Sequence, residues 1–423
     1  MEPNKNTINK IIFSGQVLRS GQEPTIDWFY NLMKYYPQKV TGLPAYALID
    51  CHYKNSSFEN YIPFDVTKFF EFYGYKNYNE LNSSDKTNIW VKMFYNNEYN
   101  EKAYEYVYSI FKDSLVIVHE LSQIIINILE YYNIPYVDLN TDPIRFLDDQ
   151  LFAFRTNYED VYSKLLKYRI DEEFFYMNAN YISAKYKTTI NETKENIVLF
   201  LGQSDSDKSL IDTATGKTYS ILDHKESFKK AIEGFDKIYY KRHPFVVNDE
   251  DILDYIKSLG NIEIVDENFY KLMFRRDIKK VVSISSGACI EAKYFDKSTE
   301  ILLRDSIKLQ YGNNFDKEAY ISIYQDFFSL NFWADILSPI AKTQFFSERI
   351  NFYGEKNKLR NSRPGRCYWG YEDIEQAMTV DLAISELKKT NSKSFKLKLL
   401  RTIYALTKNK KIKRQILEFK KHN

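Results

Sequence analysis

With 59 Lys and Arg against 57 Asp and Glu over 423 residues, the chain is nearly neutral, which excludes nucleic-acid binding through a general excess of positive charge. Apolar residues make up 44% and charged residues 27%, a globular rather than a disordered composition. The length exceeds that of one ordinary hydrophobic core and predicts two domains.

The three cysteines, Cys51, Cys289 and Cys367, lie far apart in the sequence. Their odd number and wide spacing argue against a disulfide framework or a zinc site and indicate a reducing compartment. The first ten residues, MEPNKNTINK, lack the apolar stretch of a secretory signal. We therefore expect a cytoplasmic protein, either soluble or attached peripherally to the inner face of the cytoplasmic membrane.

The first half of the chain mixes strands and helices. Strands are predicted at residues 10–16, 46–53, 113–120 and 133–140. The third could instead be the apolar start of a helix, because the stretch from Leu115, LVIVHELSQIIINILEYY, also reads as one buried helix; its polar residues argue against a membrane span. Residues 159–185 have helical spacing and predict a connector after a first α/β domain at 1–190.

The second half alternates strands and helices more regularly. Strands are predicted at 196–203, 237–244, 261–267, 279–287 and 299–304, with helices between them at 224–235, 249–260, 269–275 and 288–295. This alternation predicts a parallel, doubly wound sheet in a second domain at 191–330, followed by a helical segment at 331–423.

The end of the chain, residues 393–423, carries eleven Lys and Arg against one acid, Glu418. Leucines, isoleucines and phenylalanines are interleaved with the cations and predict an amphipathic basic helix or helix pair. Its charged face is either simply solvated or in contact with anionic lipid.

Polar residues follow three strands of the predicted second sheet. The sequence QSDSDKSLID follows the first strand, KRHP ends the second, and SSGACIEA follows the fourth. Ligands of doubly wound sheets bind outside the carboxyl ends of the strands, where these segments should converge.

In the SSG segment, Ser285, Ser286 and Gly287 lie between a strand and a helix. Hydroxyls and backbone N–H groups at such a place can bind a phosphate, and Glu291, one turn into the helix, could hold a ribose. The alternative is an ordinary helix cap with a turn glycine.

In the KRHP segment, His243 could donate a hydrogen bond to a phosphate or carboxylate leaving group. Lys241 and Arg242 would raise the local potential, and Pro244 ends the strand. The alternative is a surface strand end with solvated cations.

In the SDSD segment, Asp205 and Asp207 closely follow Gln203. A carboxylate opposite phosphate-binding groups is suited to act as a base or a nucleophile. Two alternatives are a D-x-D motif that holds a divalent ion on a sugar diphosphate, and a polar turn without further function.

Together these residues resemble the bacterial β-Kdo transferases of capsule and O-antigen assembly. That family carries segments G-Q-x-x-x-D-x-S-[IL], K-x-H-P and S-S-x-x-x-x-E-A in this order, matched here by Gly202, Gln203, Asp207, Ser209 and Leu210, by Lys241, His243 and Pro244, and by Ser285, Ser286, Glu291 and Ala292. The stretches YVDLNTDPIRFLDDQLFAFRTN, FWADILSPI and YWGYED are similar to the family too. The chain departs from it where many members have two adjacent acids, because Ser206 separates Asp205 from Asp207.

The resemblance implies a GT-B fold of two Rossmann-like domains with a cleft between them, a CMP-linked 2-keto sugar acid as donor, a glycan or lipid-linked glycan as acceptor, and no metal or other cofactor. It also implies that Asp207, or else Asp205, forms a glycosyl intermediate, with His243, Ser285 and Ser286 at the departing phosphate. If the enzyme is instead an inverting sialyltransferase, the base is the same carboxylate or one from the first, acceptor-side domain, where the candidates are Glu120, Asp142, Asp148 and Asp149.

The sequence leaves open alternatives for the role of Arg145 and for the class of enzyme. Arg145 could pair with the sugar carboxylate or form a salt bridge that holds the fold. The HP and SS motifs also occur in bacterial sialyltransferases, which would make the enzyme an inverting one that uses CMP-sialic acid. A metal-dependent UDP-sugar transferase and a non-catalytic subunit of capsule assembly are further alternatives.

Overall fold

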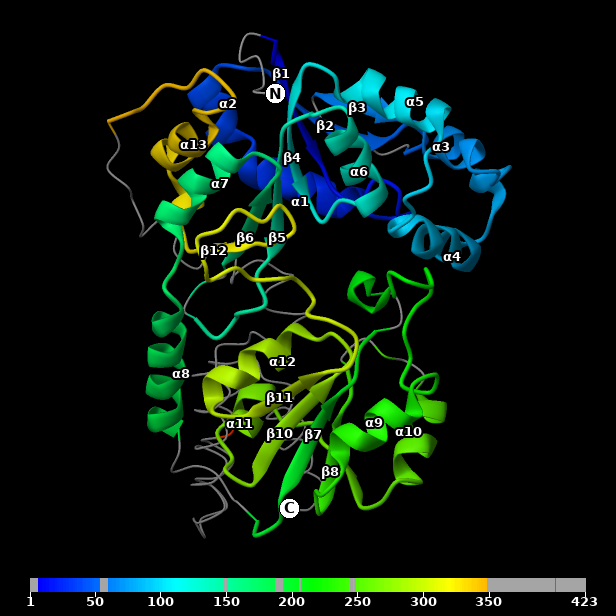
Figure 1. Cartoon of the computed structure of the whole chain (residues 1–423), viewed down its shortest axis with the longest axis vertical. Coiled ribbons are helices and arrows are strands. Elements are labelled where there is room, and N and C mark those ends of the chain that lie inside the picture. The colour runs from blue at the N-terminus through cyan, green and yellow to red at the C-terminus, as the bar shows by residue number, and fades with distance from the viewer. Residues whose placement is uncertain are drawn as a thin grey trace.

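The computed structural model describes residues 7–53, 60–147, 149, 151–186, 193–204, 207–243, 246, 249–347 and 400. Two β-sheets form two lobes that are stacked along the long axis of the molecule (Figure 1). No helix within these residues is both long and apolar enough to cross a membrane.

The sheet of the first domain has seven strands in the order β12-β6-β5-β4-β1-β2-β3. Their bounds are β1 Lys10–Ser14, β2 Ala45–Asp50, β3 Tyr61–Phe64, β4 Ser114–His119, β5 Tyr136–Thr141, β6 Phe152–Thr156 and β12 Ile321–Ile323. The strands from β3 to β5 are parallel, whereas β6 and β12 are antiparallel to their neighbours.

Both faces of this sheet are covered, because its central strands are apolar on both sides. Ile11 and Phe13 of β1 face one core and Ile12 faces the other. Helices α1 (Glu23–Met33), α2 (Tyr35–Thr41), α7 (Glu159–Leu165) and α13 (Leu330–Leu337) cover the first face. Helices α3 (Val66–Phe72), α4 (Ser83–Phe94), α5 (Glu101–Phe111) and α6 (Gln123–Tyr131) cover the second.

The second sheet is entirely parallel and has the order β11-β10-β7-β8-β9. Its strands are β7 Ile197–Leu201, β8 Lys237–Lys241, β9 Ile262–Ile264, β10 Ile278–Ser283 and β11 Ser298–Ile301. Helices α9 (Lys225–Ile232) and α10 (Glu250–Lys257) cover one face, and α8 (Glu172–Tyr186), α11 (Phe269–Met273) and α12 (Gly287–Ala292) cover the other.

The predicted α/β class with two Rossmann-like domains is confirmed. Counted from its first strand, each sheet has the parallel order 3-2-1-4-5, and the first carries two antiparallel strands in addition. All five strands predicted in the second half of the chain are present.

The interpretation of the stretch from Leu115 as one buried helix is wrong. Residues up to His119 form β4, paired with β1 and β5, and α6 begins only at Gln123. Glu120, with a φ of 61°, turns the chain between them. The β-branched residues Val116, Ile117 and Val118 favour a strand, and β4 is buried at every position because it is paired on both sides in the centre of the sheet.

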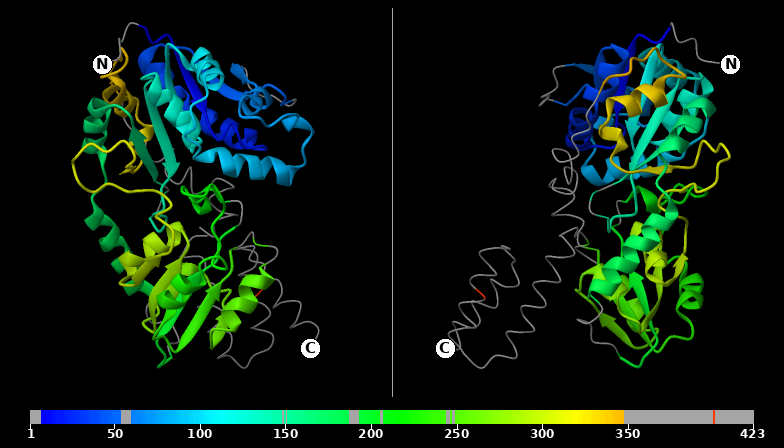
Figure 2. Two further views of the ribbon diagram at one scale, coloured as in Figure 1. Left: turned by 45° about the vertical axis from the view of Figure 1, so that its right-hand side comes forward. Right: turned by 90° about the vertical axis from the view of Figure 1, so that its left-hand side faces the viewer.

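The chain divides between the two domains differently from the predicted boundaries at 190 and 330. Helix α8 places Phe175 and Ala179 in the core of the second sheet, beside which it runs (Figure 2). Strand β12 pairs with β6 of the first sheet, and α13 packs on α2 and α7. The apolar face of α13 fills the first core, so the chain returns to the domain in which it began. The predicted helical segment beyond residue 347 and its basic tail lie outside the described residues, except for Leu400.

A substitution of Trp333 tests the assignment of α13 to the first domain. Trp333 is completely buried in the first core, and its indole N–H donates to the carbonyl of Phe327 at 2.8 Å. We expect Trp333→Ala to lower the free energy of unfolding by about 3–5 kcal/mol. Hydrogen exchange should show weaker protection of amides in β5, β6 and β12.

Amides of β7 and β10 should keep their protection in that variant. The matched control is Met177→Ala, whose side chain is 60% exposed and whose effect should stay within about 0.5 kcal/mol. Loss of protection confined to the second sheet would contradict the assignment of α13.

Candidate functional site

The strand order of each sheet reverses at one place, between β1 and β4 in the first and between β7 and β10 in the second. Loops leave the carboxyl ends of these strands in opposite directions, which opens room for a ligand. Gln16 and Glu120 follow the first pair, and the Gln16 side-chain amide donates to Glu120 Oε2 at 3.3 Å. Gln203 and Ser285 follow the second pair.

Gln203 and Ser285 lock the two loops of the second domain together. The backbone N–H of Ser285 donates to Gln203 Oε1 at 2.6 Å, and Gln203 Nε2 donates to Ser285 Oγ at 3.1 Å. The Ser285 hydroxyl donates to Ser209 Oγ at 2.8 Å. Ser286, the N-cap residue directly before α12, donates its N–H to Ser283 Oγ at 3.1 Å and is half-buried. The motif residues thus form one connected cluster.

Asp207 lies beside this cluster. Its Oδ1 accepts from the N–H of Ser209 at 2.9 Å and caps the short 3₁₀ helix η4 (Lys208–Leu210). Such a cap fixes the carboxylate at the start of the loop rather than leaving it in solution. Asp205 and Pro244 lie outside the described residues, so their predicted roles stay predictions.

His243 comes close to the cluster because residue 202 is a glycine. A Cβ at Gly202 would lie 3.0 Å from the Tyr240 hydroxyl and 3.3 Å from the backbone nitrogen of His243. Burial lowers the pKa of His243, the charge of Asp207 raises it, and the charge of Arg145 lowers it. His243 is therefore neutral near pH 7, within the electrostatic reach of a carboxylate of its own domain and a cation of the other.

The two cations of the KRHP segment have partners within the second domain. Lys241 Nζ donates to the carbonyl of Glu267 at 2.6 Å, and burial lowers its pKa. Arg242 pairs with Asp249 at 3.0 Å, whose other oxygen accepts from the Tyr240 hydroxyl at 2.7 Å. These contacts hold the ends of β8 and α10 together.

Glu291 connects the two domains. Its side chain is buried, and Oε1 accepts from the backbone N–H of Arg145 at 2.6 Å and from the Tyr270 hydroxyl at 2.9 Å. Burial raises the pKa of Glu291 to about 7, against the opposing charge of Arg145. A Cβ at Gly287 would lie 3.0 Å from Pro143, so the glycine lets α12 approach the same loop.

The other predicted acids of the first domain are buried and hydrogen-bonded. Asp142 accepts from the N–H of Ile144 at 2.8 Å and from the Ser322 hydroxyl at 2.6 Å, and burial raises its pKa to about 6. Asp149 accepts from Gln325 at 3.4 Å. Asp148 lies outside the described residues.

Lys208 was not predicted, yet it joins the candidate residues of the two domains. Its ammonium lies 3.0 Å from Glu120 Oε1 and donates to Asn140 Oδ1 at 3.2 Å. Burial alone would raise the pKa of Glu120, but Lys208 and His119 oppose it and bring the pKa to about 2. Glu120 is therefore ionised. The sequence feature that could have pointed to Lys208 is its position directly after Asp207.

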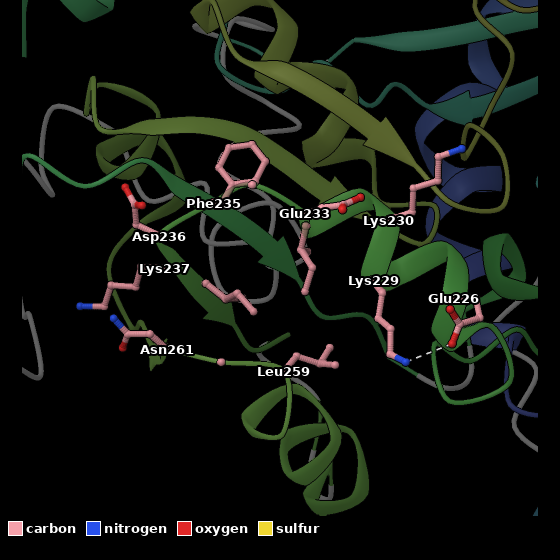
Figure 3. Close-up of a pocket in the computed structure, with 13 residues that line it drawn as sticks. Glu226, Lys229, Lys230, Glu233, Phe235, Asp236, Lys237, Leu259 and Asn261 are labelled. Carbon is pink, nitrogen blue, oxygen red and sulfur yellow. Dashed lines mark hydrogen bonds and ion pairs between the residues drawn. The ribbon is translucent and has the colours of Figure 1, made fainter.

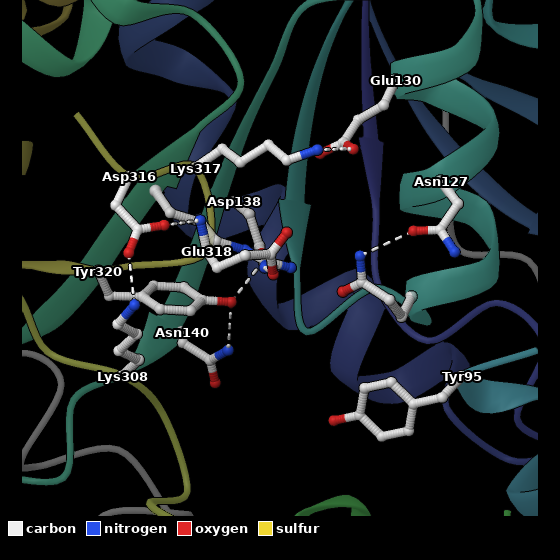
Figure 4. A network of polar contacts seen from close by, with 12 residues as sticks. Tyr95, Asn127, Glu130, Asp138, Asn140, Lys308, Asp316, Lys317, Glu318 and Tyr320 are labelled. Carbon is white, nitrogen blue, oxygen red and sulfur yellow. Dashed lines mark hydrogen bonds and ion pairs between the residues drawn. The ribbon is translucent and has the colours of Figure 1, made fainter. Parts of the chain in front are cut away.

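A buried network behind Asn140 supports this contact (Figure 4). Asn140 Nδ2 donates to the Tyr320 hydroxyl at 3.2 Å, which donates to Asp138 Oδ2 at 2.7 Å. Arg155 donates to the same Asp138 oxygen at 2.8 Å and to Glu318 at 3.1 Å. Strands β5 and β6, together with the segment that leads into β12, thereby orient the amide that meets Lys208.

Several buried polar atoms near Glu120 have no hydrogen-bond partner among the described residues. They are Gln16 Oε1, both ring nitrogens of His119 and Ser122 Oγ. His119 packs between the rings of Trp28, Phe29 and Phe152. Because buried polar groups are normally satisfied by protein, water or ligand, this edge of the first sheet can receive a small polar ligand or water.

A surface pocket of about 550 Å³ lies elsewhere (Figure 3). Its lining includes Asp236 and Lys237 at the amino end of β8, and Asn261 before β9. The amino ends are the edge of the sheet opposite to the motif residues, so this pocket is separate from the candidate site.

No protein-family model matches the sequence, and no curated protein matches it either. Among solved structures, the chain is similar to sugar transferases and to nucleotide-sugar epimerases. One is Thermosulfurimonas dismutans KpsC, a β-Kdo 2,7 transferase, at 15% identity over 52% of this chain and 75% of that chain, with a TM-score of 0.30. Another is the UDP-GlcNAc 2-epimerase of Methanocaldococcus jannaschii, at 10% identity over 69% and 83%, with a TM-score of 0.25.

Protonation of Glu291 should couple stability to pH. Its pKa of about 7 in the folded protein exceeds its ordinary value of 4.5, so the folded protein retains a proton that the unfolded chain has lost. The stability from this group is complete below pH 4.5 and is lost as the pH rises through 7, and the raised pKa of Asp142 acts in the same direction up to about pH 6.

Glu291→Gln keeps an acceptor for Arg145 and Tyr270 but cannot ionise. Urea unfolding gives the free energy of unfolding near pH 5 and near pH 8. Between these two pH values, this free energy should fall less in the variant than in the wild type, by about 1–3 kcal/mol. Glu233→Gln, at an exposed position, is the control and should leave the wild-type pH dependence intact. Equal pH dependence in Glu291→Gln and the wild type would contradict the assignment.

Proposed function

We propose that this chain is a glycosyltransferase that moves a 2-keto sugar acid of the Kdo type from its CMP-activated donor to a surface-polysaccharide or glycolipid acceptor. One observation carries the proposal. Gln203, Asp207 and Ser285 lie where the strand order of the second sheet reverses, His243 follows the adjacent strand β8, and these residues match the motifs of the β-Kdo transferases.

His243 would assist the departure of CMP. Because burial lowers its pKa, the imidazole is neutral near pH 7 and has one N–H to donate to a phosphate oxygen. A hydrogen bond of this kind strengthens as negative charge develops on the leaving group, which lowers the barrier. The loop of Ser285 and Ser286 follows β10, which β7 separates from the β8 strand of His243, and would contact the same phosphate from the other side.

Asp207 would act as the nucleophile. Its carboxylate attacks the anomeric carbon while the bond from that carbon to the phosphate oxygen breaks and CMP leaves. The acceptor hydroxyl then displaces the carboxylate and loses its proton, so two inversions give net retention. In the alternative, an inverting transfer from CMP-sialic acid, a carboxylate only removes the proton of the acceptor.

Glu120 is the acid of the first domain best placed for the acceptor side. Lys208, the neighbour of Asp207, contacts it directly. His119 and Ser122 lie close to Glu120 in the chain, and the Gln16 side-chain amide donates to it from the loop after β1. Glu120 is ionised, as a proton acceptor must be, but the pairing with Lys208 lowers its pKa and makes it a weak base. The Lys208 contact would therefore have to loosen before Glu120 accepts the proton of the acceptor hydroxyl.

A donor panel tests the proposal. CMP-Kdo, CMP-sialic acid and UDP-sugars are each incubated with the full chain and an acceptor mixture, and released nucleotide is measured. We expect CMP release from CMP-Kdo that is unchanged in EDTA, reduced at least about 100-fold in His243→Ala and about 1,000-fold in Asp207→Asn. His224→Ala and Asp212→Asn, which change an exposed histidine and an exposed-loop acid of the same domain, are the matched controls.

The other outcomes separate the alternatives. CMP release from CMP-sialic acid alone, with inverted product, would indicate the sialyltransferase. UDP release that stops in EDTA would indicate the metal-dependent transferase. No release from any donor, from a folded chain, would contradict enzymatic activity. Mass spectrometry of a glycosyl adduct on Asp207 or Asp205 would distinguish the two carboxylates.

A further inference from the structure

Four potential metal ligands converge at the carboxyl end of β2, away from the motif residues. Asp50, Cys51 and His52 each offer one ligand atom, and these atoms lie within 4.8 Å of one another. A fourth group comes from another element, since Nε2 of His52 lies 3.7 Å from Oδ1 of Asp65. Within the described residues no other group of three or more such side chains comes this close together.

The sheet register brings the fourth ligand to the other three. Asp50 of β2 is paired with Phe64 of β3, and the N–H of Cys51 donates to the Phe64 carbonyl at 2.9 Å. The next residue, Asp65, therefore lies beside Cys51 and His52 although 13 positions separate it from His52 in the sequence. Parallel pairing, rather than a spacing motif, assembles the cluster.

Asp65 is held firmly in place. Its Oδ1 caps α3 by accepting from the N–H of Lys68 at 2.9 Å, and its own N–H donates to the Tyr106 hydroxyl at 2.6 Å. On the other strand, Asp50 Oδ1 accepts from the N–H of His52 at 3.2 Å. A carboxylate offers two oxygens and about four lone-pair positions, so each can bind an ion and keep these bonds.

We propose that Asp50, Cys51, His52 and Asp65 form a zinc site that joins the β2 end to the start of α3. One sulfur, one imidazole nitrogen and two carboxylate oxygens are the donor types that Zn²⁺ accepts, whereas Mg²⁺ and Ca²⁺ prefer oxygen alone. Bonds of about 2.0–2.3 Å in a tetrahedron place ligand atoms roughly 3–4 Å apart. The His52–Asp65 pair at 3.7 Å has this spacing, and the ligand atoms of Asp50, Cys51 and His52, within 4.8 Å of one another, are near it.

The proposed site would be a structural rather than a catalytic zinc site, and a zinc ion could reach it from solvent. With four protein ligands no position is left open for a substrate. Cys51 is exposed and the His52 side chain is 50% exposed, so neither is committed to core packing. The sequence argued against a zinc site because its three cysteines are widely spaced. That argument could not take Asp65 into account, because only the pairing of β2 with β3 brings Asp65 to the other three residues. The inference does not depend on the proposed function.

Metal titration of the full chain tests the site. The protein is stripped with chelator and titrated with Zn²⁺ in competition with a chromophoric chelator, and then with Co²⁺ for its spectrum. We expect about one tight equivalent and a cobalt spectrum with a thiolate charge-transfer band. Cys51→Ser should remove the band, and His52→Ala and Asp65→Asn should each weaken binding at least about tenfold.

Two variants serve as controls. Cys367→Ser removes another thiol, and His224→Ala removes another exposed histidine, and both should bind like the wild type. Circular dichroism checks that Asp65→Asn, which touches a helix cap, stays folded. Absence of tight binding in the wild type, or a thiolate band that survives Cys51→Ser, would overturn the proposal.

Discussion

The arrangement of the candidate site depends on the ammonium group of Lys208, which lies against a carboxylate and an amide oxygen of the other domain. Lys208 belongs to the short helix that Asp207 caps, so this contact places Asp207 at the junction of the two sheets. Partly buried charges are costly unless they are paired and hydrogen-bonded, and the network behind Asn140 supplies that support. The site is thus assembled by electrostatics across the junction and not by either sheet alone.

Protonation divides the acids of the junction into two groups. Glu120 is ionised because a cation lies against it, whereas burial raises the pKa values of Asp142 and Glu291 towards neutrality. At neutral pH, Glu120 is fully ionised and Asp142, with a pKa of about 6, is mostly ionised, whereas Glu291, with a pKa of about 7, keeps its proton about half of the time. The contact between Glu291 and the loop of Arg145 does not need a charged carboxylate, because the groups that donate to Glu291 are the backbone N–H of Arg145 and the Tyr270 hydroxyl. The contact is therefore compatible with the raised pKa of Glu291.

Much of this fold could be predicted from the sequence, because buried parallel strands are continuous apolar runs. The strand Ile197–Leu201 and the polar residues that follow it are an example. Strand β3 was not predicted, since Pro63 interrupts an otherwise short run, and β12 has only three residues. At the site, the sequence indicated which loops converge but not their partners. Arg145 and Glu291 are 146 positions apart, and Lys208 and Glu120 are 88 apart by their numbers, so no local pattern records either contact.

The return of the chain to its first sheet has a consequence for the order of folding. During synthesis the N-terminal strands emerge first, but β12 and α13, which complete their sheet and core, emerge only after all of the second domain. The second domain can fold as soon as residues 193–301 are available, whereas an apolar face of the first domain is still uncovered at that point. The domain that begins to be made first is therefore the one finished last, and a chain truncated near residue 320 would have one complete domain and one open core.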